Sequence, residues 1–190
     1  GGGIIQSDPS GGSDLLSGIA VDSSYIYLTG WDTGHDQWRT EKRDINTGAL
    51  VAAFDGDGII QSNPTSGSED YSQGLAIDSS YIYIAGNDNT AGNAQWRIEK
   101  RDKTTGALVT AFGGDGIVQS NPSSGGEYSK SIAVDSSYIY IAGDDNAAGN
   151  GQIRIEKRDK TTGALVTAFD SDGAVQINPG SNYDSADGGI

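Results

Sequence analysis

A long internal repeat constrains the fold of this sequence more than any other feature. The segment SGIAVDSSYIYLTG at residues 17–30 returns at 73–86 and 130–143, with offsets of 56 and 57 residues. The segment QWRTEKRDINTGALVAAF at residues 37–54 returns at 95–112 and 152–169, with offsets of 58 and 57. Because such near-identical segments fold alike, the chain is predicted to contain one structural unit three times.

Each unit is predicted to consist of short β-strands joined by turns. In the first unit, residues 18–22 are small and apolar, and residues 25–30 are rich in aromatic and β-branched residues. In the second, residues 95–102 alternate between two faces, and residues 107–112 and 117–120 also have strand character. No segment shows sustained helical periodicity, so the chain is predicted to be all-β.

The repeat length favours a β-propeller-like array of four-stranded blades, with three full repeats and a partial fourth. A β-solenoid or a row of tandem β-modules is the alternative, although solenoid coils are usually shorter and sandwich modules need more strands per unit. The predicted boundaries are residues 1–17 for the partial repeat, 18–73, 74–130 and 131–187 for the full repeats, and 188–190 for the start of a further one.

The stretch RIEKRDKTTGALVTAFGGDGIV at residues 97–118 resembles the bacterial delta-sixty repeats, whose pattern closes on Phe-Gly-Gly-Asp-Gly-Ile/Val. The preceding IAVDSSYIYIAG segment is similar to the strand pair before that close, and the resemblance extends over all three units. Two copies depart from the motif, with DGD at residues 55–57 and DSD at 170–172. The resemblance implies propeller repeats of a large secreted or surface protein and no shared catalytic residues.

Variants of the segment GIIQSNP (residues 58–64) occur near both ends, as GIIQSDP at 3–9 and GAVQINP at 173–179. The three full repeats therefore come with one surplus copy of this segment. Three blades are too few to close a ring, since propellers typically have four to eight. Further repeats of a longer chain could complete the array, or the surplus strand could complete a blade in a neighbouring copy, because an unpaired strand edge pairs readily with another chain. The expected partners are therefore copies of this chain or further repeats of the same chain.

The composition excludes several classes of partner. The formal net charge is −14, with 26 acidic and 12 basic residues, so the chain repels nucleic acid and anionic membrane surfaces. No apolar run approaches the roughly 18 residues of a membrane span. The sequence has no Cys, which excludes disulfides and thiolate metal sites.

Acidic residues at the Gly-rich passage between units form the first candidate site. Asp55 and Asp57 lie two residues apart, a spacing that lets two carboxylates and a carbonyl converge on calcium. Asp170 and Asp172 repeat this spacing, and the middle copy keeps Asp115. Calcium is the one cofactor that the pattern suggests. Turn formation, in which Asp binds backbone N–H groups, explains the same residues.

The variable loops after the second strand of each unit form the second candidate site. They are predicted to gather at one rim of the array, where a ligand would bind, or else to be solvated loops. Their polar residues are Asp32 and Asp36, Asp88 and Asn89, and Asp144, Asp145 and Asn146.

Signals for catalysis are absent from the sequence. His35 is the single histidine, in a loop without a nucleophile pattern, and no motif for metal or phosphate chemistry is present. The repeated tyrosines, Trp38 and Trp96 are predicted to pack between blades rather than to bind sugars. The repeated EKRD segments are predicted to form exposed cross-strand ion pairs of about 0–1 kcal/mol each.

These observations predict a non-enzymatic, extracellular or cell-surface protein that serves as a structural or adhesive scaffold and extends head to tail into a filament. The alternative is a propeller module that recognises a glycan or a protein through its variable rim loops.

Overall fold

A computed structural model describes residues 3–7, 11–12, 14–32, 34, 36–65, 70–147 and 149–178. His35 and the predicted boundary at 188–190 lie outside the described residues. Within these ranges the chain is all-β, as predicted, with no helix. Its strands are β1 (Leu15–Val21), β2 (Tyr25–Asp32), β3 (Gln37–Asp44), β4 (Ile59–Ser62), β5 (Tyr71–Ile77), β6 (Tyr81–Asp88), β7 (Gln95–Asp102), β8 (Ile117–Ser120), β9 (Tyr128–Val134), β10 (Tyr138–Asp145), β11 (Gln152–Asp159) and β12 (Ala174–Ile177).

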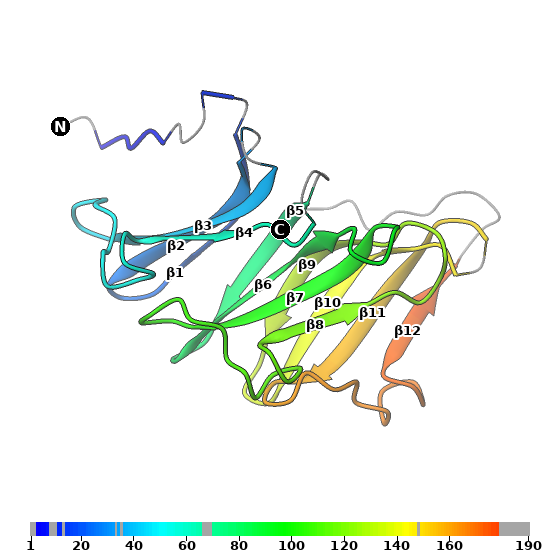
Figure 1. The fold of residues 1–190 in the computed structure, drawn as a ribbon. Coiled ribbons are helices and arrows are strands. Elements are labelled where there is room, and N and C mark those ends of the chain that lie inside the picture. The colour runs from blue at the N-terminus through cyan, green and yellow to red at the C-terminus, as the bar shows by residue number, and fades with distance from the viewer. Residues whose placement is uncertain are drawn as a thin grey trace.

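The strands form three four-stranded antiparallel sheets, one per repeat: β1–β4, β5–β8 and β9–β12. Each is a meander in which consecutive strands are neighbours. The register is the same in all three, including an irregularity between the first and second strands. Figure 1 shows the sheets following one another in chain order, and β5 contacts β1 while β9 contacts β5.

Asp residues shape the hairpin turns. Between β1 and β2, Asp22 Oδ1 accepts the backbone N–H groups of Ser24 and Tyr25 at 2.8 and 2.9 Å. Between β3 and β4, Asp44 accepts two backbone N–H groups in the same way, and Gly48 adopts a φ of 72° that other residues disfavour. The other two sheets repeat both turns, so the short polar residues fix where each strand ends.

The prediction of a strand at residues 107–112 was wrong. Only Leu108 forms a bridge there, with Arg101. The backbone then turns, since Phe112 N–H donates to Val109 O and Gly116 N–H donates to Phe112 O. This turn buries the Phe112 ring, and the fourth strand of the sheet is β8.

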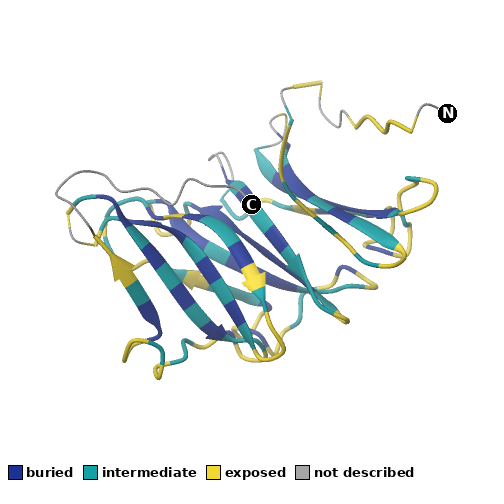
Figure 2. Cartoon of the chain, turned by 180° about the vertical axis from the view of Figure 1, so that it is seen from behind, coloured by how far each residue is buried: buried dark blue, intermediate teal, exposed yellow. Residues whose placement is uncertain are grey.

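The apolar core lies between the sheets. One cluster joins the first sheet to the second and another joins the second to the third. Buried residues recur along the strands of all three sheets, whereas most turns are exposed (Figure 2). In the described part of the chain, no helix of sufficient length and apolar character to cross a membrane occurs.

Candidate functional site: the joint between successive sheets

The contact between one sheet and the next, here called the joint, occurs twice in the structure. Each sheet has a leading face toward the preceding sheet and a trailing face toward the following one. The trailing face of the first sheet contributes Tyr27, Trp38, Phe54 and Ile60, and the leading face of the second contributes Leu75, Ile82 and Ile84. The second joint uses the equivalent positions: Tyr83, Trp96, Phe112 and Val118 against Ile132, Ile139 and Ile141. Tyr27, Tyr83, Trp38 and Trp96 thus pack between the sheets, as predicted, whereas the tyrosines of the third sheet belong to neither cluster.

A tryptophan from each trailing face approaches a glycine of the next sheet. A Cβ at Gly86 would lie 2.6 Å from Trp38 Cζ2 and 2.8 Å from the Cα of Ser72. At the second joint, a Cβ at Gly143 would lie 2.8 Å from Trp96 Cζ2. The backbone oxygens of Tyr71 and Tyr128 lie closer still to these Cβ positions. Real side chains do not reach such distances, so glycine here makes room both for the neighbouring first strand and for the indole ring.

Polar contacts across the joint also occur twice. Lys42 Nζ donates to Lys103 O at 2.8 Å, and Asp55 N–H donates to Thr105 O at 2.9 Å. Lys103 Nζ pairs with the carboxylate of Asp22 at 3.0 Å. The second joint repeats these contacts with Lys100, Lys160, Gly113, Thr162 and Asp78. Each joint therefore combines an apolar centre with a fixed set of hydrogen bonds.

The EKRD segments differ from their prediction. Glu99 is fully buried and binds Arg97 and Arg101 of its own strand at 2.9 and 2.8 Å. Ser62 Oγ of the preceding sheet adds a hydrogen bond to Glu99 Oε2 at 3.1 Å. The ion pairs are thus buried and lie within one strand, because alternation places residues i and i+2 on the same face and the preceding sheet covers that face. The third sheet repeats the arrangement around Glu156.

The residues predicted to bind calcium lie in turns beside the joint. The second Asp of each copy accepts the backbone N–H two residues later, at 2.8–2.9 Å (Asp57, Asp115 and Asp172). Asp55 and Asp170 have positive φ values of 52° and 51° and open the same turn. Across the described ranges, no group of three or more His, Cys, Asp or Glu side chains is arranged to hold a metal ion. Calcium binding here remains a prediction.

The residues predicted for the rim divide by burial. Asp88 Oδ1 accepts Gln95 Nε2 at 2.7 Å, and its Oδ2 accepts Gln119 Nε2 at 2.9 Å, so this carboxylate ties three strands of its own sheet together. A ligand at this edge would meet the half-buried residues before the buried carboxylates. The buried members are Asp32, Asp88, Asp144 and Asp145, and the half-buried members are Asp36, Asn89 and Asn146.

The sequence pattern did not predict the pairs of opposed carboxylates at this edge. Tyr71 lies opposite Asn87 in the β5–β6 register, which places Asp70 opposite Asp88, and both carboxyls are fully buried. Burial raises the pKa of Asp70, and the charge of Asp88 raises it further. In the third sheet Glu127 lies opposite Asp145, and burial likewise raises the pKa of Glu127. Counting back from the β-hairpin would have missed this pairing, because the register shifts by one residue between Ser72 and Gly74.

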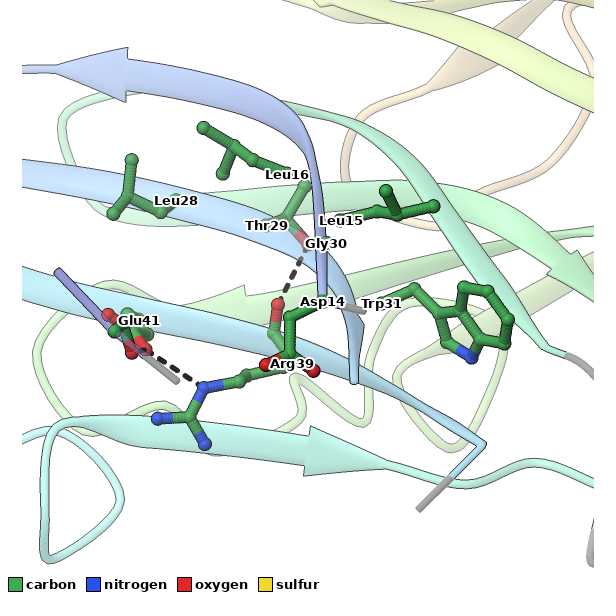
Figure 3. Close-up of a pocket in the computed structure, with 10 residues that line it drawn as sticks. Asp14, Leu15, Leu16, Leu28, Thr29, Gly30, Trp31, Arg39 and Glu41 are labelled. Atoms are coloured by element: carbon green, nitrogen blue, oxygen red, sulfur yellow. Dashed lines mark hydrogen bonds and ion pairs between the residues drawn. The ribbon is translucent and has the colours of Figure 1, made fainter. Parts of the chain in front are cut away.

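Among the described residues, two sheet faces have no neighbouring sheet. On the leading face of the first sheet, Ile19 is 62% exposed, whereas the equivalent Leu75 and Ile132 are 9% and 8% exposed. Val21 is 58% exposed, whereas the equivalent Ile77 and Val134 are partly buried. This face has a pocket of about 200 Å³ beside Gly30. At the first joint, Trp38 fills the equivalent position beside Gly86 of the second sheet. Figure 3 shows Leu16 beside Gly30 in this pocket and Leu28 farther along the strand of Gly30, with Arg39 and Glu41 on the neighbouring strand.

The trailing face of the third sheet is the other half of the same joint. Its residues occupy the positions of Tyr27, Trp38, Phe54 and Ile60, but all are only partly buried (Tyr140, Ile153, Phe169 and Val175). The outer faces of the first and third sheets thus carry the positions that form the two sides of an internal joint.

No protein-family model matches the chain, and no curated protein matches it either.

Proposed function

We propose that the protein is a non-enzymatic structural scaffold of β-propeller-like blades that extends head to tail into a filament. In this assembly, the leading face of the first sheet in one copy docks on the trailing face of the third sheet in another copy. Such a contact is heterologous, so it generates a ring or an open filament according to the rotation at each step.

The observation that carries this proposal is the recurrence of the joint. Every apolar position that the two internal joints bury on the leading face stays apolar on the first sheet (Ile19, Val21, Ile26 and Leu28). Large exposed apolar patches mark interaction surfaces in soluble proteins. A sheet of this repeat type is the occupant that the internal joints demonstrate, and a second copy supplies one.

The propeller arrangement draws support from the placement of the first strands. β1, β5 and β9 lie in succession, and a groove lined by all three includes Leu16, Gly18, Gly74 and Ser131. First strands around a central channel are typical of propeller blades. An extracellular or cell-surface location rests on the resemblance to the delta-sixty repeats.

Light scattering over a range of concentrations, with negative-stain electron microscopy, tests the assembly. We expect oligomers of increasing length in which the repeat distance equals one chain. Ile19→Glu with Val21→Glu should leave the chain folded and monomeric, because two carboxylates would be buried in the joint. Ala111→Glu, at an exposed turn of the second sheet, is the matched control and should assemble normally. A wild-type chain that stays monomeric at all concentrations would contradict the proposal.

A further inference from the structure

Residues 3–7 occupy the place of a fourth strand on the leading face of the first sheet. Ser7 Oγ donates to Glu41 Oε1 at 3.0 Å, as Ser62 Oγ donates to Glu99. Ile5 covers Gly48 as Ile60 covers Gly106. Residues 4–7 read IIQS, the same sequence as β4.

Residues 3–7 make the contacts that a fourth strand makes with the following sheet, but they do not belong to a sheet themselves. β4 pairs with β3, and β8 pairs with β7, whereas residues 3–7 pair with no strand in the described part of the chain. Ile4 and Ile5 are 82% and 51% exposed. A strand equivalent to β3, from a sheet placed before the first, would complete this arrangement.

β12 of the third sheet lacks two features of the other fourth strands. Ala174 replaces the first isoleucine, and Ile177 replaces the serine that binds the buried glutamate of the next sheet. β12 therefore cannot supply the hydroxyl for Glu41 of a following copy, whereas Ser7 already does.

A third difference lies at the centre of the same faces. The internal joints set a tryptophan beside a serine, with Trp38 next to Ser72 and Trp96 next to Ser129. The two outer faces carry Ile153 and Leu16 at these positions. The smaller residue on the trailing face thus meets a larger one on the leading face, and an exchange that conserves volume is well tolerated in packed interfaces.

We propose that copies join by strand exchange, in which residues 4–7 of one copy pair with β11 of the preceding copy in place of β12. This inference rests on the head-to-tail docking proposed above and specifies how that joint forms. The register follows from the internal sheets, where Ile60 lies opposite Thr40 and Val118 opposite Ile98. Ile5 of one copy therefore lies opposite Ile155 of the other, the position that Val175 occupies within one chain.

Disulfide trapping tests the exchange, since the natural sequence has no cysteine. Ile5→Cys chains are mixed with isotopically labelled Ile155→Cys chains under mild oxidation, and mass spectrometry identifies the dimers. Directly opposed residues meet the Cα separation that a disulfide needs. We expect the mixed dimer to predominate, and Ile4→Cys, one residue out of register, to give at least about tenfold less.

Hydrogen exchange on the wild-type chain provides a second measurement that needs no substitution. On assembly, the amides of β12 should lose protection while those of residues 4–7 gain it. Oligomers in which β12 stays protected and no mixed dimer forms would overturn strand exchange but leave face-to-face docking intact. A chain that never oligomerises would overturn both.

Discussion

The internal joints and the two outer faces are built from the same repeat positions but differ in what covers them. At the first joint, Leu75 is buried under the first sheet, whereas its equivalent Ile19 is exposed. Most joint positions keep their residue type on both outer faces, and the few that change do so where the two faces would meet, as with Ile153 and Leu16. The comparison shows that the outer faces keep most residues of an internal joint without the sheet that covers it.

The largest expected effect concerns the buried charges of an internal joint. Glu99→Gln would leave Arg97 and Arg101 without their buried carboxylate and should cost about 3–5 kcal/mol of unfolding free energy. The matching change Glu41→Gln should cost less, because no sheet covers the leading face there and Glu41 lines the pocket on that face. Urea titration of both variants measures the difference, and equal losses would contradict the distinction between covered and uncovered faces.

The close approach at Gly86 gives the next prediction. Gly86→Ala would force a methyl group against the backbone oxygen of Tyr71 and against the Trp38 ring, and overpacking of this kind costs at least about 1–3 kcal/mol. Gly74→Ala is the matched control, since its Cβ would meet its nearest neighbours at 3.7 Å, and Ser131 already carries a side chain at that repeat position. Thermal melting should show a lower Tm for the Gly86 variant alone.

Much of this architecture could be predicted from the sequence, because repetition and alternation are local signals. Most of the strands and the burial of Trp38 followed from residue type and spacing. The burial of Glu99 did not, because it depends on Ser62 and on the sheet that covers it. The strand prediction for residues 107–112 failed for a similar reason. These residues form a turn that packs against the next sheet, and their apolar side chains do not belong to a strand.

The candidate site was predictable only in outline. The unpaired edge was visible as a surplus IIQS segment, but its contact with Glu41 required the three-dimensional arrangement. The Asp residues at the turns and the loop edge stand out in the sequence as a pattern. Their burial and their hydrogen bonds depend on strand register, which places Asp70 opposite Asp88 and cannot be read from spacing within one strand.

A double-mutant cycle compares the outer joint with the internal one. Ile153→Trp should clash with Leu16 of the next copy, and Leu16→Ser should leave a cavity against Ile153, so each alone should weaken association by about tenfold. Together, the two substitutions recreate the tryptophan–serine pair of the internal joints and should restore the association. Sedimentation velocity measures the association constants, and strictly additive losses would show that the two residues do not meet.

The buried carboxyl of Asp70 should make stability depend on pH. Its pKa is raised in the folded protein, so the folded state holds this proton more tightly than the unfolded state, and stability falls as the pH rises above about 3.8 through the folded pKa. Asp70→Asn removes this cost while keeping an acceptor for the backbone N–H of Thr65. We expect the variant to be more stable at pH 7 and equally stable below pH 4, as measured by urea titration at each pH. A destabilised variant at pH 7 would show that the ionised carboxylate has a favourable partner.

The smallest effect is expected from the ion pair between Lys103 and Asp22, whose repeat equivalent at the outer joint has Ile45 in place of the lysine. Burial alone would raise the pKa of Asp22, but hydrogen bonds from the backbone of Ser24 and from Lys103 lower it to about 2. A carboxyl with a lowered pKa contributes stability that is present above about pH 4 and is lost as the pH falls toward 2. Lys103→Ala should therefore cost no more than about 1 kcal/mol at pH 7, because the pair is partly solvated, and the difference from wild type should shrink below pH 4.

Ile45→Lys provides the converse test at the proposed outer joint. The new ammonium would face Asp135 of the preceding copy and should strengthen association slightly at low salt. If Ile45→Lys weakens association instead, Asp135 does not occupy the position that Asp22 has in the internal joint, and the equivalence of the two joints fails at this contact.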